Sequence, residues 1–72
     1  MSSLIQETKN LILQYLKRFP EAKDTPDGIA SFWINRNHEE VAIALKELIN
    51  ENLIFEKNLG NKKVYGLMNS GE

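Results

Sequence analysis

The residues that could carry out acid–base or metal chemistry are few and poorly placed for it. His38 is the only histidine and the chain has no cysteine, so neither a metal site with nitrogen and sulfur ligands nor a thiolate nucleophile is expected. Glu39 and Glu40 are neighbours, but adjacent residues of a helix do not face one another. The four glycines lack any phosphate-binding spacing. The sequence therefore predicts a protein that is not an enzyme, with no metal, no cofactor and no small-molecule substrate.

A group of basic residues near the C-terminal end points instead to phosphate binding. Lys57, Lys62 and Lys63 lie in residues 57–66, which contain no acidic residue. Lysines on an exposed hairpin can lie along a phosphate backbone, and Arg36, in a short polar stretch, is a further candidate for a phosphate contact. The alternative is that these lysines only protect a strand edge and keep the protein soluble.

The charge of residues 38–51, in contrast, argues against phosphate binding. This segment holds four acidic residues and one lysine, so phosphates would be repelled from much of it. With its apolar side buried, three candidates for contacts to base edges remain on the outward side: Ile43, Lys46 and Asn50. Ile43 could equally lie at the centre of a protein interface.

Hydrophobic periodicity predicts the elements that must position these residues. Apolar residues at helical spacing indicate helices over 3–19, 26–34 and 38–51. Strand-forming residues on both sides of the loop NLGNK indicate a β-hairpin over 53–68. Residues 69–72 are expected to be frayed.

Local signals set the helix boundaries. Thr25 and Asn37 are typical N-caps for the second and third helices, and Asn52 is the usual substitute for glycine at a left-handed helix end. Gly28 costs about 1 kcal/mol relative to alanine inside a helix, which indicates close packing against a neighbour. Asp24 and Thr25 could add a short edge strand.

The large apolar residues predict both a core and possible contact points. Phe19 completes the buried stripe of the first helix, and residues 29–34 are so apolar that either most of them are buried or some of them contact a partner. Trp33 is either a core residue or a ligand or partner contact. Leu13 points away from the stripe, which makes it either a lone exposed leucine or a contact to a partner.

The run VAIALKELINENLI, which starts at Val41, resembles the recognition-helix signature of the winged helix-turn-helix superfamily. The order of the predicted elements is also similar to this superfamily over nearly the whole chain. The resemblance implies a single α+β, mainly α domain over 1–72, with three helices followed by a two-stranded antiparallel β-hairpin wing. It also implies a non-enzymatic transcription regulator that binds double-stranded DNA through the third helix and the wing.

Composition agrees with one small domain but gives DNA binding no support. The chain has 72 residues, a net charge of −1 and a pI of about 5.8, whereas domains that bind DNA usually show a basic bias. No apolar run is long enough to span a membrane and no signal peptide is recognised, so a cytoplasmic location is expected.

A second function therefore stays open beside nucleic-acid binding. A winged helix can also serve as a protein-docking or dimerisation module without DNA binding. The contact surface would then be formed by Leu13, Trp33 and Ile43, against a protein partner or a second copy of the chain.

Overall fold

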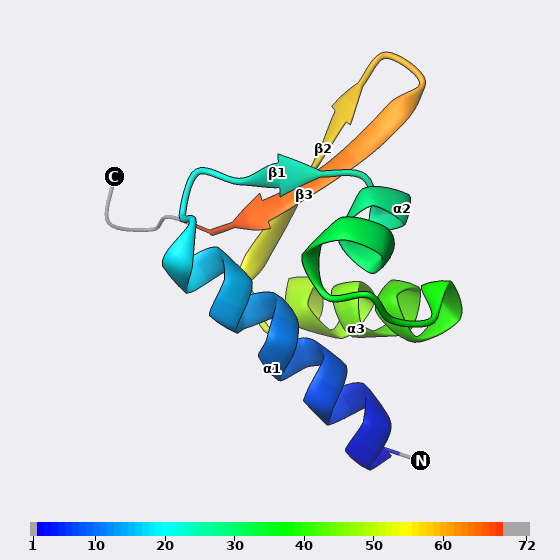
Figure 1. Ribbon diagram of the computed structural model, residues 1–72. Coiled ribbons are helices and arrows are strands. Elements are labelled where there is room, and N and C mark those ends of the chain that lie inside the picture. The colour runs from blue at the N-terminus through cyan, green and yellow to red at the C-terminus, as the bar shows by residue number, and fades with distance from the viewer. Residues whose placement is uncertain (1, 69–72) are drawn as a thin grey trace.

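The protein is α+β and mainly helical (Figure 1). The computed structural model describes residues 2–68, with side chains from residue 4 onward, so the tail that was expected to be frayed lies outside the described residues. In chain order the elements are α1 (Ser2–Arg18), β1 (Lys23–Asp24), α2 (Pro26–Gly28), the π-helix η1 (Ile29–Trp33), α3 (His38–Asn50), β2 (Ile54–Leu59) and β3 (Lys62–Leu67).

The described strands form one antiparallel sheet in the order β1-β3-β2. The predicted hairpin is present, with Leu59 opposite Lys62 at its tip, where Gly60 adopts a positive φ of 66°. The expectation of a two-stranded sheet was incomplete, because β1 pairs with β3 as a third strand. This strand consists of Lys23 and Asp24 rather than Asp24 and Thr25, since Thr25 starts the next helix.

The core lies where α1 crosses α3 beside the sheet (Figure 1). α1 contributes Ile12 and Leu16, both almost completely buried, and η1 contributes Ile29. α3 presents an apolar stripe at helical spacing, and Ile54 joins it from the start of β2. The buried stripe of α3 consists of Val41, Ala44, Leu45 and Leu48. Periodicity predicted this stripe because each of these positions returns to the same side of the helix.

The helix predicted over 26–34 is not a regular α-helix. One α-turn, α2, runs into the π-helix η1, in which the Ile34 N–H donates to the Ile29 carbonyl at 3.3 Å. A hydrogen bond between residues five apart closes a wider turn than the turn of an α-helix. Residues three apart therefore no longer share a face as they do in an α-helix. Ile29 and Ala30 are buried, as expected for most of this segment, whereas Phe32 has an exposed fraction of 83%.

The predicted caps are confirmed. The Thr25 hydroxyl accepts from the Gly28 N–H at 3.2 Å, and the Asn37 carboxamide oxygen accepts from the Glu39 N–H at 2.7 Å. Asn52 has a φ of 63°, the left-handed conformation that asparagine tolerates better than most residues. These caps turn the chain sharply at both ends of α3 and so place the polar turn 35–37 and the hairpin beside it.

A buried ion cluster joins α1 to α3. The Lys9 ammonium lies 3.2 Å from Glu47 Oε1 and 2.5 Å from Glu51 Oε2, and only 6% of Lys9 is exposed. The hydrogen bond to Glu51 raises the pKa of Lys9 above its ordinary value, which keeps the ammonium charged. The burial of Lys9 could not be predicted from α1 alone, since the acids that pair with it lie 38 and 42 residues further along the chain.

Gly28 is closely packed, as its cost inside a helix had indicated. It is buried, and a Cβ at this position would collide with the Asp24 carboxylate. That carboxylate is itself held in place, because its Oδ1 accepts from the Thr25 N–H at 2.7 Å. The glycine therefore lets β1 and α2 approach one another.

Gly28→Ala is expected to lower the free energy of unfolding by about 1–2 kcal/mol, because Asp24 must move and lose its hydrogen bond. Chemical denaturation measures this change. In an Asp24→Ala background the same substitution should be neutral or stabilising, since alanine is the better helix former. Equal effects of Gly28→Ala in both backgrounds would contradict the proposed role of this contact.

Candidate functional site

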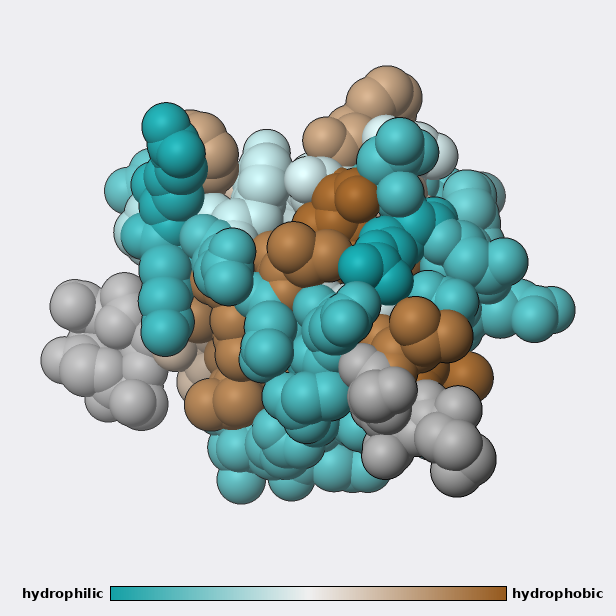
Figure 2. All heavy atoms as spheres, turned by 60° about the horizontal axis from the view of Figure 1, so that its bottom comes forward, coloured by the Kyte–Doolittle hydropathy of each residue, from teal (hydrophilic) through white to brown (hydrophobic). Residues whose placement is uncertain are grey.

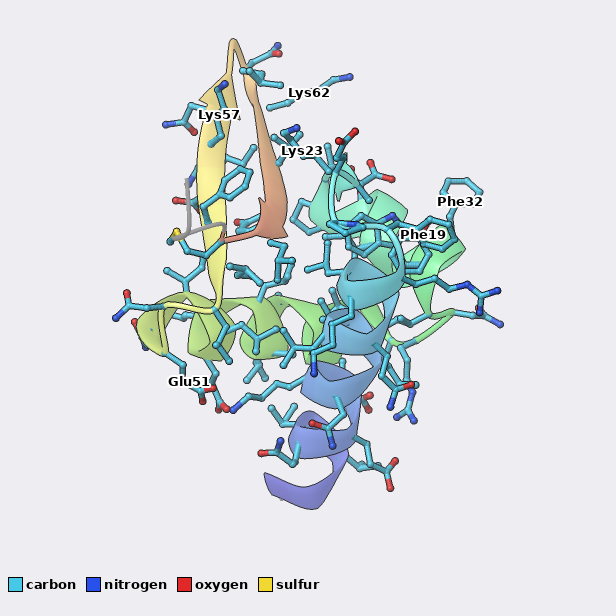
Figure 3. All side chains as sticks on the ribbon, turned by 90° about the vertical axis from the view of Figure 1, so that its left-hand side faces the viewer. Phe19, Lys23, Phe32, Glu51, Lys57 and Lys62 are labelled. Carbon is cyan, nitrogen blue, oxygen red and sulfur yellow. The ribbon has the colours of Figure 1, made fainter. Side chains whose placement is uncertain are left out.

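Three lysines share one face of the sheet. Residues opposite one another in an antiparallel pair point to the same side, and sides alternate along each strand. Lys57 is opposite Val64, and Lys23 is opposite Gly66. Lys62, Val64 and Gly66 are every second residue of β3 and therefore point to the same side. Lys23, Lys57 and Lys62 thus lie on one side of the sheet, where Figure 3 shows them around the hairpin. We call the surface formed by these three residues the basic face.

Lys63 does not belong to the basic face. It lies on the opposite side of the sheet, where its Nζ is 3.8 Å from Glu56 Oε2. The same Glu56 oxygen accepts from the Tyr65 hydroxyl at 2.9 Å. The lysines grouped in the sequence are thus divided between two faces, and Lys23, which lies outside the predicted hairpin, takes the place of Lys63.

Arg36 is held by two carboxylates. Its guanidinium lies 3.2 Å from Glu7 Oε1 and 3.8 Å from Glu40 Oε1, and 27% of its side chain is exposed. Its backbone N–H donates to the Ala30 carbonyl at 2.9 Å. Arg36 therefore ties the turn to α1 and α3, and its charge is less available to an external phosphate than the sequence suggested.

The outward side of α3 keeps the candidates for base contacts. Ile43 is 48% exposed, and Lys46 and Asn50 are exposed. The acids that argued against phosphate binding are partly compensated, because Glu47 and Glu51 pair with Lys9. One lysine against two glutamates still leaves this cluster with one net negative charge, so α3 does not form a cationic surface.

An aromatic groove lies between the end of α1 and η1. The rings of Tyr15 and Trp33 stack with centroids 4.4 Å apart and planes 12° apart, and Phe19 lies 4.9 Å from Tyr15. These residues line a groove of about 570 Å³ together with Phe32 and Arg18. The Arg18 guanidinium lies 5.9 Å from the centroid of the Phe19 ring.

The sequence did not locate this groove, because it placed Phe19 on a buried stripe and left the rings of residues 29–34 open between the core and a partner contact. Phe19 is 47% exposed, and Phe32 projects into solvent. Trp33 packs partly against the core and also lines the groove, and its contact to a ligand or partner stays a prediction. The available signal was the excess of large apolar residues in 29–34, more than one helix face can bury.

The three residues proposed for a protein interface do not all line this groove. Leu13 is partly buried against the core, so the prediction that it points into solvent is wrong. Neither Leu13 nor Ile43 lines the groove at Trp33. Figure 2 shows several apolar patches divided by hydrophilic residues on the face it presents.

Within residues 2–68 there is no cluster of three or more histidine, cysteine, aspartate or glutamate residues able to hold a metal ion. His38 Nδ1 lies 3.1 Å from Asp27 Oδ1, and both side chains are largely exposed. None of the helices in this range is long and apolar enough to cross a membrane.

Tyr65 reports on the electrostatics of the sheet face opposite the basic face. Burial raises the pKa of Tyr65 to about 12, and the hydrogen bond to Glu56 contributes to the rise. Since the folded-state pKa lies above the unfolded value of about 10, the shift favours folding at lower pH. This contribution is fully present below pH 10 and is lost as the pH rises through about 12.

Glu56→Gln is expected to lower the pKa of Tyr65 while leaving it above 10, because burial remains. The phenolate absorbance, followed against pH in a Tyr15→Phe background, isolates Tyr65. An unchanged titration curve would show that the contact between Tyr65 and Glu56 does not form in solution.

Comparisons of the chain with protein-family models, with curated proteins and with solved structures gave no match.

Proposed function

We propose that this domain binds nucleic acid through its basic face, as a non-enzymatic winged helix-turn-helix protein of transcription-regulator type. The observation that carries the proposal is the common orientation of Lys23, Lys57 and Lys62 on one side of the sheet. The order of helices followed by a hairpin supports the winged-helix assignment. In this proposal β2 and β3 form the wing.

The basic face is suited to phosphates because its charges are available. All three lysines are exposed, and no carboxylate of residues 4–68 lies within ion-pair distance of them. An exposed ammonium can replace a condensed counterion on a nucleic acid, and the released ion provides the driving force. Lysines that only protected strand edges would need no common orientation.

In this proposal α3 contributes less to nucleic-acid binding than the recognition helix of a typical helix-turn-helix protein does. Its outward candidates, Ile43, Lys46 and Asn50, include a single cation, beside an ion cluster that retains negative charge. Contacts through this helix would select among sequences only after the basic face has bound the backbone. Binding is therefore expected to depend weakly on sequence and strongly on salt.

Replacement of Lys57 and Lys62 by alanine is expected to weaken binding to a generic double-stranded DNA. It should also reduce the steepness of the log–log salt dependence by about 0.9 for each lysine. Fluorescence anisotropy at a series of salt concentrations measures both quantities, and Lys23→Ala should reduce the slope further.

Two matched substitutions control for the loss of positive charge. Lys63→Ala removes a lysine from the other side of the same hairpin, and Lys46→Ala removes one from α3. Both should change the slope less than Lys57→Ala does. A slope that responds equally to all five lysines, or to none of them, would contradict binding through the basic face.

Dimerisation is the second candidate function, and the exposure of Ile43 in the middle of α3 favours it. If two copies meet through this helix, Ile43→Asp should convert a dimer to a monomer, because burying an unpaired carboxylate at an interface is costly. Analytical ultracentrifugation at high protein concentration measures this. A chain that sediments as a monomer before and after the substitution has no such dimer.

A further inference from the structure

We infer that the aromatic groove binds unpaired bases, so that the preferred ligand of this domain is a single-stranded nucleic acid whose backbone follows the basic face. This inference rests on the proposed function, because the basic face must hold the phosphates. The aromatic groove is then a second contact surface, and it favours single-stranded over double-stranded nucleic acid.

The groove leads toward the basic face. A second hollow of about 500 Å³ shares Tyr15, Arg18 and Phe19 with the groove and extends past Glu21 to Ala22. The next residue is Lys23, which belongs to the basic face. Figure 3 shows Phe32 and Phe19 on one side of Lys23, with Lys62 and Lys57 on the other. A single extended chain could therefore contact both surfaces.

The groove has aromatic rings and a guanidinium on which an unpaired base can stack. Phe32 in η1 and Phe19, the residue after α1, are both exposed, and both line the same hollow. Every base has a flat π face, so stacking on aromatic side chains binds bases with little dependence on sequence. Arg18 beside Phe19 adds a planar cation that can stack on a base or pair with a phosphate.

A duplex cannot use this surface in the same way. Its bases are stacked on one another, and extracting one costs free energy that an unpaired strand does not need. The phosphates of a duplex can still contact the lysines. Duplex binding should therefore depend on the basic face alone, whereas single-strand binding should depend on both surfaces.

The shape of the second helix explains why the groove exists. The wide turn of η1 directs Phe32 outward and leaves Trp33 against Tyr15. Wide turns of this kind are frequent at functional sites. Trp33 is the only tryptophan in the chain, so its fluorescence reports directly on the groove.

The test compares three ligands of the same strand length: an oligothymidine of about 12 nucleotides, its abasic counterpart and a duplex of generic sequence. The abasic strand keeps the phosphates but has no bases to stack. Phe32→Ala is expected to weaken oligothymidine binding by about 5- to 100-fold. It should leave the abasic strand and the duplex unchanged, since Phe32 contacts no phosphate.

Trp33 fluorescence provides the second readout, and Leu4→Ala the matched control. Oligothymidine should quench Trp33, whereas the abasic strand should not. Leu4 is an exposed apolar residue near the start of α1 that does not line the groove, so its truncation should leave all three affinities unchanged. Because Phe32 is largely exposed, its truncation should leave the fold intact, which circular dichroism checks.

The outcomes separate this inference from the proposed function. If Lys57→Ala weakens all three ligands while Phe32→Ala changes none, the inference is wrong and the proposed function stands. If no ligand binds at low salt, both are wrong. A Trp33 response to an aromatic, acidic peptide but not to oligothymidine would assign the groove to a protein partner and overturn the inference.

Discussion

The burial of Lys9 between α1 and α3 is the interaction on which the distribution of charge over the molecule depends. A buried ammonium is tolerated only when it is paired, and its partners are Glu47 of α3 and Glu51, the residue that follows α3. Both acids are thereby turned toward α1. The charges between α1 and α3 hold the two helices together, while Lys23, Lys57 and Lys62 have no ion-pair partner among residues 4–68. The same contact helps to fix α1, whose other end carries Arg18 and Phe19 to the groove.

The elements with a strong repeating pattern could be predicted from the sequence, and those that depend on distant partners could not. Apolar residues at helical spacing predicted α1 and α3, and strand-forming residues on both sides of the loop NLGNK predicted the hairpin. Lys9 shows the limit, because its partners lie 38 and 42 residues further along the chain. A helical projection cannot distinguish a lysine that meets two carboxylates from one that meets water. The strand β1 was located only to within one residue, since a two-residue strand has no periodicity of its own.

The candidate site was predicted only in part, for two physical reasons. The first is register: Lys62 and Lys63 are adjacent in the sequence but lie on opposite faces, and only the pairing of β3 with β1 brings Lys23 to the face of Lys62. The second is the geometry of η1. The prediction used the residue spacing of an α-helix. The wider turn of η1 moves Phe32 away from the side that would be buried in an α-helix. Both errors concern the direction of side chains on a segment whose place in the chain was predicted.

A net charge of −1 does not prevent such a domain from binding an anionic polymer, because charges act over a limited distance in salt. The molecule measures 34 × 28 × 21 Å, whereas the screening length is about 8 Å at physiological ionic strength. A phosphate at the basic face is therefore affected mainly by the nearby lysines and much less by acids on the far side of α1 and α3. At an ionic strength of 0.01 M the screening length rises to about 30 Å, comparable with the longest dimension of the molecule. The acids between α1 and α3 then repel the ligand as well, so the gain in affinity on lowering the salt should diminish in this range.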